Sequence, residues 1–182
     1  MKYAMVLLGF LACNFSPNKN DATAADGSSA IVIQSDSLAP PQYDPQNRLI
    51  RLEKSDAQWK RELNELEYHV LREEGTERAF TGDLWNNHDS GTFICRGCGL
   101  PLFASATKFD SGTGWPSFWK PIDPRFVTEN RDNRYGMLRV EVECARCGGH
   151  LGHVFDDGPK PTGLRYCIIS VWLDFVKKAV GH

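Results

Sequence analysis

The sequence lacks an excess of basic residues. Its 182 residues include 21 Lys and Arg against 23 Asp and Glu, which gives a formal charge of −2, and the pI is near 6.2. A domain that binds nucleic acid needs a basic surface to neutralise phosphates. The composition therefore argues against nucleic acid as a partner. Nothing in it suggests a large interface, so we expect a monomer.

The apolar run at the N-terminus, residues 3–12, falls short of the roughly 20 residues that span a bilayer. Its length matches the apolar region of a signal peptide. Leu11-Ala12-Cys13 resembles a bacterial lipoprotein processing site, although Phe10 stands where leucine is usual. We expect residues 1–13 to be a signal peptide and the protein to be exported, either periplasmic or anchored to the membrane through a lipidated Cys13. An ordinary secretory signal and a disordered apolar start stay open.

Internal repeats are also missing, apart from two CxxC pairs. A chain of this length fits one folded domain with an appendage. Residues 14–51 are rich in Ser, Asn, Asp, Ala and Pro. They can bury too little apolar surface to offset the entropy lost on ordering, so we expect a flexible tether. The folded domain is predicted at residues 52–176, and residues 177–182 form a tail.

Two short helices are predicted at the start of the domain. Capping-box patterns, in which a polar residue and a Glu or Gln three residues later exchange hydrogen bonds, occur at residues 55–58 and 64–67, with a break near Leu63. Gly75 is expected to end the second helix. One side of the helices should pack on a sheet. Its residues are Trp59, Leu63, Leu66 and Val70.

Short strands and turns are predicted after the helices, because the chain's 16 Gly and 10 Pro lie among short apolar runs. Residues 91–95 and 137–142 are predicted strands, and in the second of them Leu138, Val140 and Val142 alternate with charged side chains. Residues 164–175 also have a period of two and are predicted as one strand. One face of that strand carries Cys167, Ile169, Val171, Leu173 and Phe175.

Four of the six cysteines form two matched knuckles, each a CxxC pair followed by glycine. This spacing lets two thiolates face one ion, and the glycine permits a tight turn. Two such knuckles complete a tetrahedral site of four thiolates, which is structural and not catalytic. Two disulfides or a redox CxxC are the alternatives. We predict a structural zinc ion held by Cys95, Cys98, Cys144 and Cys147.

Cys167 has no partner cysteine nearby, and Arg165 lies two residues before it on the same face of the predicted strand. A guanidinium beside a thiol favours the thiolate, which is the nucleophilic form. The pattern therefore indicates a candidate nucleophile. The alternative is a small apolar residue on a buried strand, since a free cysteine is often buried and inert.

Two further groups of residues could serve chemistry. His150 and His153, three residues apart, could form an acid/base pair, or each could be a satisfied polar residue. Residues 112–119 are an aromatic cluster around Trp115 that could form a pocket for a small apolar group such as a thioether methyl. Core packing is the alternative for this cluster.

Taken together and in order, these motifs closely resemble the methionine-R-sulfoxide reductase (MsrB) family. The resemblance covers about residues 52–175, and the ordered set is far more specific than any single motif. The matching motifs are GTER at residues 75–78, CRGC at 95–98, SGTGWPSFW at 111–119, CARC at 144–147, GHLGHVFDDGP at 149–159 and RYC at 165–167.

The resemblance implies a mainly β fold of two antiparallel sheets in an open barrel-like arrangement, with short helices at the N-terminal side. It also implies thiol-dependent reduction of methionine-R-sulfoxide, free or in oxidised proteins, and a structural zinc at the two knuckles. Cys167 would be the nucleophile, which becomes a sulfenic acid. His150 and His153 would bind the sulfoxide oxygen and supply protons, and Arg165 would be the basic neighbour of the nucleophile. The methionine methyl would enter a pocket of Trp115 and Phe155.

The sequence departs from the family pattern at Thr113, where many members have a resolving cysteine. We therefore expect an external reductant, a thioredoxin-like protein or a small thiol, to reduce the sulfenic acid. It also departs at Ile169, where the family usually has Asn. A more apolar site should raise the pKa of the thiol and lower the activity without abolishing it. Ile169 is the one feature that favours the alternative function, a zinc-knuckle binding module with weak or lost catalysis.

Overall fold

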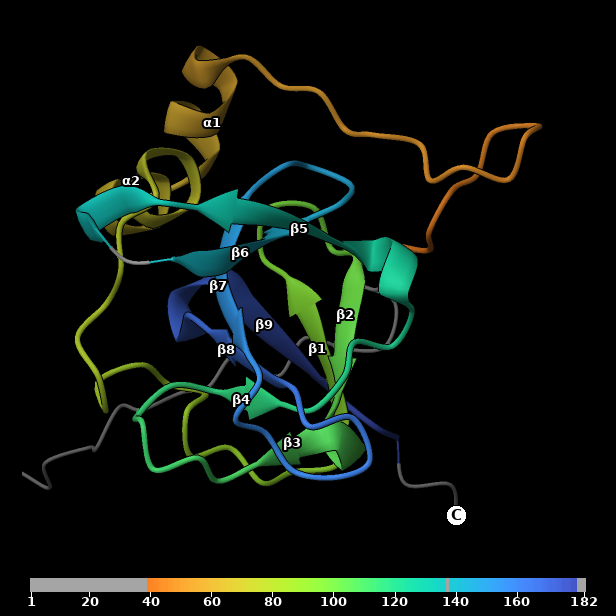
Figure 1. Cartoon of the computed structure of the whole chain (residues 1–182). Helices are drawn as coiled ribbons and strands as arrows, with labels where there is room; N and C mark the ends of the chain where they lie inside the picture. The colour runs from red at the N-terminus through yellow and green to blue at the C-terminus, as the bar shows by residue number, and fades with distance from the viewer. Residues whose placement is uncertain (1–38, 137, 180–182) are drawn as a thin grey trace, which may run out of the picture.

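The structure is a computed structural model that describes residues 39–136 and 138–179. The predicted signal peptide with Cys13, residues 14–38 of the predicted tether and residues 180–182 of the tail lie outside the described residues. Figure 1 labels the helices and strands. They are α1 (Asp56–Glu62), α2 (Glu65–Glu73), β1 (Gly91–Cys95), β2 (Pro101–Ala104), β3 (Lys108–Phe109), β4 (Ser117–Phe118), β5 (Val127–Asp132), β6 (Arg139–Cys144), β7 (His150–Phe155), β8 (Arg165–Ile168) and β9 (Leu173–Lys177).

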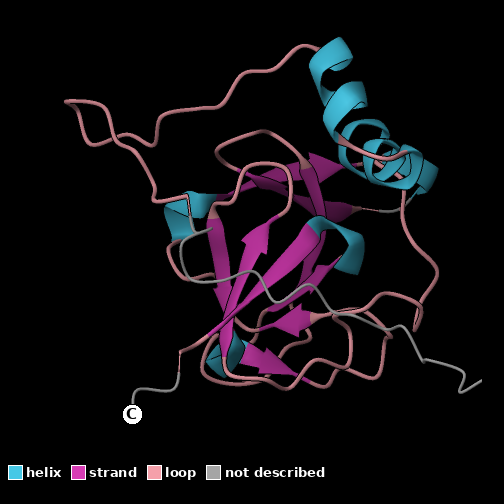
Figure 2. Cartoon of the chain, turned by 180° about the vertical axis from the view of Figure 1, so that it is seen from behind, coloured by secondary structure: helices cyan, strands magenta, loops and turns pink. Residues whose placement is uncertain are grey.

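The strands form two sheets. One has the order β2-β1-β9 and the other β3-β4-β8-β7-β6-β5, with antiparallel pairing throughout. Within the described ranges neither sheet closes on itself, which confirms a mainly β fold with two antiparallel sheets and short helices. Figures 1 and 2 show both helices together at one side of the strands. None of the helices in the described part of the chain has the length and apolar character needed to cross a membrane.

The core joins the two sheets through aromatic rings. Phe93 of β1 and Phe103 of β2 both contact Phe118 of β4, with ring centroids 4.9 Å and 4.4 Å apart, and all three side chains are fully buried. Burying a phenyl ring removes a large apolar area from water and stabilises the fold by about 2 kcal/mol or more. These contacts hold β4, and therefore the neighbouring β8, against the smaller sheet.

The two helices begin as predicted. Ser55 and Asn64 are the N-caps, and each takes part in a complete capping box. The predicted apolar side is wrong at Leu66, which is 49% exposed, while Leu71 is buried. The extended backbone at Leu63 turns α2 away from the direction of α1, so one helical stripe cannot run through both.

The second helix ends close to Gly75, but the left-handed residue is Glu74, with φ of 56°. Gly75 instead allows a close contact with His69. A Cβ atom at Gly75 would lie 2.4 Å from the imidazole ring of His69, a distance that side chains do not tolerate.

Residues 164–175 are not one strand, so this prediction is wrong. β8 ends at Ile168, a 3-10 turn covers Ser170–Trp172, and β9 belongs to the other sheet. The buried carboxylate of Glu77 accepts the backbone N–H groups of Ser170 and Val171 at 2.6 Å and 3.1 Å. This contact comes from more than 90 residues away in the chain, so a periodicity argument has no access to it.

The predicted strand at 137–142 lies instead at Arg139–Cys144, and Leu138 is 82% exposed. Residues 39–51, the described part of the predicted tether, follow the domain surface. Tyr43 and Leu49 form a β-bridge, the ring of Tyr43 lies under the guanidinium of Arg125, and the N–H of Leu52 donates to the carbonyl of Arg146.

Candidate active site and metal centre

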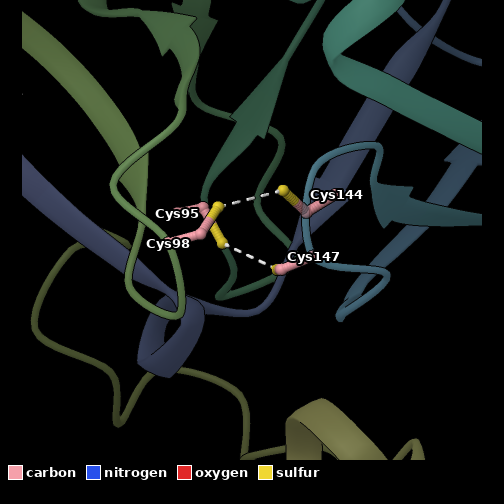
Figure 3. A group of neighbouring side chains, drawn as sticks. All are labelled: Cys95, Cys98, Cys144 and Cys147. Atoms are coloured by element: carbon pink, nitrogen blue, oxygen red, sulfur yellow. Dashed lines mark hydrogen bonds between the residues drawn. The ribbon is translucent and has the colours of Figure 1, made fainter. Parts of the chain in front are cut away.

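The two CxxC knuckles meet in space, as Figure 3 shows. The Sγ atoms of Cys95 and Cys147 are 3.7 Å apart, those of Cys98 and Cys144 are 3.5 Å apart, and all four lie within 4.8 Å of one another. These separations are too long for a disulfide, whose sulfur atoms lie about 2.05 Å apart. They fit a tetrahedral ion at about 2.3 Å from each sulfur, which places the sulfurs about 3.8 Å apart. These four cysteines could hold a metal ion.

Each knuckle follows a strand of a different sheet, because β1 ends at Cys95 and β6 ends at Cys144. The glycine after each pair has a positive φ, 72° at Gly99 and 66° at Gly148, and its N–H donates to the carbonyl of the first cysteine of the pair. An ion bound here would therefore tie the two sheets together. Such an ion would have a structural role, because none of the four cysteines lines the cavity described below.

Cys167 lies in the middle of the large sheet. It pairs with Ser117 of β4 on one side and with His153 of β7 on the other. Residues directly opposite each other on antiparallel strands project from the same face. The cysteine is thus flanked on one side by a hydroxyl and on the other by an imidazole, and its side chain is partly buried.

The pKa of the Cys167 thiol is raised, because burial disfavours the thiolate more than its neighbours favour it. Arg165 and the hydroxyl of Thr113, 3.9 Å from the sulfur, act in the opposite direction. Arg165 is also bound to Asp157 by two hydrogen bonds of 2.8 Å, and its guanidinium lies over the ring of Phe155. Asp157 therefore compensates part of the positive charge of Arg165, which weakens the stabilisation of the Cys167 thiolate by Arg165.

Both histidines are held by carboxylates. Nδ1 of His150 lies 2.6 Å from Glu141, and Nε2 of His153 lies 2.8 Å from Asp132. Burial lowers the pKa of His150 to about 4 and also lowers the pKa of His153. Each imidazole is therefore neutral at pH 7. Among the residues that the structure describes, the other ring nitrogen of each histidine has no hydrogen-bond partner and is available to a ligand.

Sequence reasoning missed the two carboxylates. Asp132 and Glu141 are only 3% and 7% exposed, and Arg134 and Arg139 both contact Asp132, at 3.0 Å and 2.7 Å. The available signal was the alternation of apolar and charged residues along β6. Glu141 lies opposite His153 of β7 and contacts His150, so the charged side of β6 is turned toward the histidines.

A cavity of about 600 Å³ brings most of the predicted site residues together. Gly152, His69 and Glu73 belong to its wall. The predicted residues that line it are Cys167, His150, His153, Trp115, Phe155 and Ile169. Arg165 does not line this cavity, although it stacks on Phe155, which does.

Ile169 and Thr113 both lie at the site, at the positions where members of the family in the sequence analysis usually have Asn and often have a resolving Cys. Ile169 is 5% exposed and presents its apolar side chain to the cavity. Thr113 brings a hydroxyl to Cys167 and also contacts the hydroxyl of Ser111 at 2.8 Å. No second thiol lies at this place, because every other cysteine among the described residues belongs to the metal centre.

Comparison with known proteins agrees with this geometry. Residues 63–177 match the SelR domain model. Three curated relatives carry the name peptide methionine sulfoxide reductase MsrB. The protein from Agrobacterium fabrum is 58% identical over 118 residues, 65% of this chain and 87% of the relative. Those from Thiobacillus denitrificans and Methanosarcina mazei are 57% and 56% identical, over 69% and 70% of this chain and 95% and 91% of their own lengths. The domain match and these relatives together show that the chain belongs to the MsrB family of methionine sulfoxide reductases.

Proposed function

We propose that the protein is a peptide-methionine (R)-S-oxide reductase, which reduces methionine-R-sulfoxide to methionine. The observation that carries the proposal is the single cavity shared by a partly buried thiol, two carboxylate-held histidines and an indole ring. A binding module has no need of this set. The family supplies the substrate, and the cavity supplies groups for each part of its chemistry.

In the proposed step, the sulfur of Cys167 attacks the sulfoxide sulfur. The oxygen of the substrate faces His150 and His153, and the methyl group lies against Trp115 and Phe155. The protonated oxygen leaves as water and a sulfur–sulfur bond joins Cys167 to the substrate. Attack of water on the Cys167 sulfur then breaks this bond, releases methionine and leaves Cys167 as a sulfenic acid. Asp132 and Glu141 act as positioning residues, because they fix the ring orientation of the histidines and compensate the positive charge that a protonated ring would carry.

The resting site holds the proton that this step needs. With the thiol pKa raised and the histidine pKa values lowered, Cys167 keeps its proton at pH 7 and the imidazoles are neutral. Transfer of one proton from the thiol to a histidine produces the nucleophile and the acid together. The small hydroxyl-lined space around Thr113 offers no second thiol, so we propose that an external thiol reduces the sulfenic acid.

We propose zinc as the ion at the four cysteines, since four thiolates in a closed tetrahedron are the usual donor set of structural zinc. The ion would fix the positions of β1 and β6 and supply no group to the reaction.

We further propose that the protein is exported and tethered to the membrane through Cys13, where it repairs oxidised proteins. Detection of the acylated N-terminal peptide by mass spectrometry would support this location, and an unprocessed Met1 in cells would contradict it.

The test of the function is the reduction of separated sulfoxide epimers. With dithiothreitol as the reductant, methionine-R-sulfoxide in a blocked peptide should be reduced at least about a hundredfold faster than the S epimer, because the methyl pocket and the histidines fix the order of groups around the sulfur. Chromatography of the released methionine peptide measures both rates. Equal rates for the two epimers, or none for either in a folded metal-bound protein, would contradict the proposal.

Ile169→Asn should raise the rate of the first turnover by about three- to tenfold, because an amide that donates to the thiolate lowers the pKa of Cys167 and one pKa unit corresponds to a factor of ten.

The wild-type rate should be nearly constant from about pH 6 to 8, since internal proton transfer leaves the number of bound protons unchanged. Rapid-quench measurements across this range test both statements, with Ile169→Val as the control that keeps the pocket apolar. A tenfold rise per pH unit, or no gain in the Asn variant, would contradict this account.

A further inference from the structure

The backbone just after Cys167 is held by a residue from the other end of the domain. β8 ends at Ile168, and a 3-10 turn at Ser170–Trp172 follows it, with Ile169 as the N-cap residue. The first N–H groups of a helical turn have no partner inside the turn, and an oxygen of the N-cap side chain usually accepts one of them. Ile169 has no such oxygen and makes no side-chain cap hydrogen bond. The acceptor for these N–H groups therefore has to come from another part of the chain.

Glu77 supplies this acceptor. Its carboxylate accepts the N–H of Ser170 at 2.6 Å and that of Val171 at 3.1 Å, and the side chain is only 8% exposed. The rest of the loop after Glu77 is packed tightly on the turn. A Cβ atom at Gly82 would lie 2.2 Å from the Cβ atom of Ser170, and the N–H of Leu84 donates to the Ser170 hydroxyl at 2.8 Å. The turn is thus fixed in place by this loop.

The same loop also holds the backbone beside Trp115. The N–H of Phe80 donates to the carbonyl of Gly114 at 2.9 Å, and a Cβ atom at Gly114 would lie 2.7 Å from the ring of Phe80. Phe80 has a φ of 66°, which phenylalanine rarely adopts and which persists only where the surrounding contacts enforce it. One short loop is therefore bonded to the backbone next to two residues that line the cavity, Trp115 and Ile169.

We propose that Glu77 is a positioning residue that limits the size of the S-alkyl group that the cavity accepts, because it holds Ile169 in a fixed place relative to Trp115. The inference rests on the proposed function, in which the methyl group of the substrate lies against Trp115. Glu77 itself does not line this cavity, so it acts only through the turn. When the N–H groups of the turn lose their acceptor, the turn and Ile169 can shift, and the space for the alkyl group widens. An ethyl group should then be accepted more readily.

The test is a competition between two blocked peptides that differ only in carrying methionine-R-sulfoxide or ethionine-R-sulfoxide. Both are reduced in one vessel by the full-length protein with dithiothreitol, and mass spectrometry measures the two products. The resulting ratio of kcat/KM values does not depend on the amount of folded enzyme, so a loss of stability alone leaves it unchanged. The wild type should prefer the methyl substrate by at least about tenfold, the usual effect of one methylene group in an apolar pocket. Glu77→Ala should lower this preference by about fivefold.

Glu77→Gln should lower the preference by about twofold, because the amide oxygen still accepts one of the two N–H groups. Glutamine also has the size of glutamate, so this variant carries the test if the alanine variant does not fold. Thr107→Val is the matched control. Thr107 is buried as well, but it lies outside the cavity, and its hydroxyl donates to the carbonyls of Ala104 and Lys120. The control should lower the melting temperature and leave the ratio of the two substrates unchanged.

An unchanged ratio in the Glu77 variants would overturn the inference. A fall of the same size in Thr107→Val, or a wild type without preference for the methyl substrate, would overturn it too. In each of these cases continued reduction of the methionine-R-sulfoxide peptide leaves the proposed function standing. A folded wild type that reduces neither peptide would overturn both.

Discussion

Cys167→Ser should lower the rate of methionine-R-sulfoxide reduction by about a thousandfold or more. A serine hydroxyl is a far weaker nucleophile than a thiol and cannot form the sulfenic acid. The variant should keep its fold, because the side chain is partly buried and serine has nearly the same size. Peptide reduction with dithiothreitol measures the loss, and the melting temperature checks the fold.

Cys13→Ser is the control for this experiment, since Cys13 is the one other cysteine outside the knuckles. It should leave the rate with dithiothreitol unchanged in the full-length protein. After one turnover without reductant, dimedone should label Cys167 and mass spectrometry should detect no internal disulfide. A disulfide to Cys167, or substantial activity in Cys167→Ser, would contradict the proposed chemistry.

Cys144→Ser should destabilise the domain by about 3 kcal/mol or more, which corresponds to a fall in melting temperature of about 10 °C. Cys144 is buried at the end of β6, and its Sγ atom is 3.5 Å from that of Cys98 in the other sheet. Loss of one thiolate weakens the ion that ties β1 to β6. Calorimetry and metal analysis of the purified protein would measure both effects.

Ala145→Ser is the matched control, because it changes the same knuckle and leaves all four thiols in place. Its metal content should match that of the wild type. A strong chelator should lower the melting temperature of the wild type and of Ala145→Ser alike. If Cys144→Ser lost its metal without losing stability, the knuckles would not be the structural tie between the sheets.

Several features were predictable because the interactions that form them are local. Ser55 and Asn64 bond to residues three positions away, so their capping boxes can be read directly from the chain. The glycine after each CxxC pair has the positive φ that a tight knuckle requires. The convergence of the two knuckles on one site also followed from their matched spacing.

Other features depend on contacts between residues that are far apart in the chain. The period of two predicted one strand through Cys167 and Phe175, but Glu77 binds the backbone at Ser170 and the strand divides between the two sheets. The alternation along β6 separates its apolar from its charged residues, but it does not show that Glu141 is buried and holds His150. Periodicity distinguishes the two faces of a strand and does not say what lies against them.

The sequence by itself therefore determined the chemical groups of this protein: a lone thiol, two histidines, an indole and four paired cysteines. Their order along the chain was enough to predict the family. Tertiary structure alone decided which carboxylates hold the histidines, and that Cys167, both histidines and Trp115 line one cavity. The physical reason is that burial and charge compensation are properties of the packed sheets. Asp132 is buried and contacts His153, whereas Asp110 is exposed, although both are aspartates in the same chain.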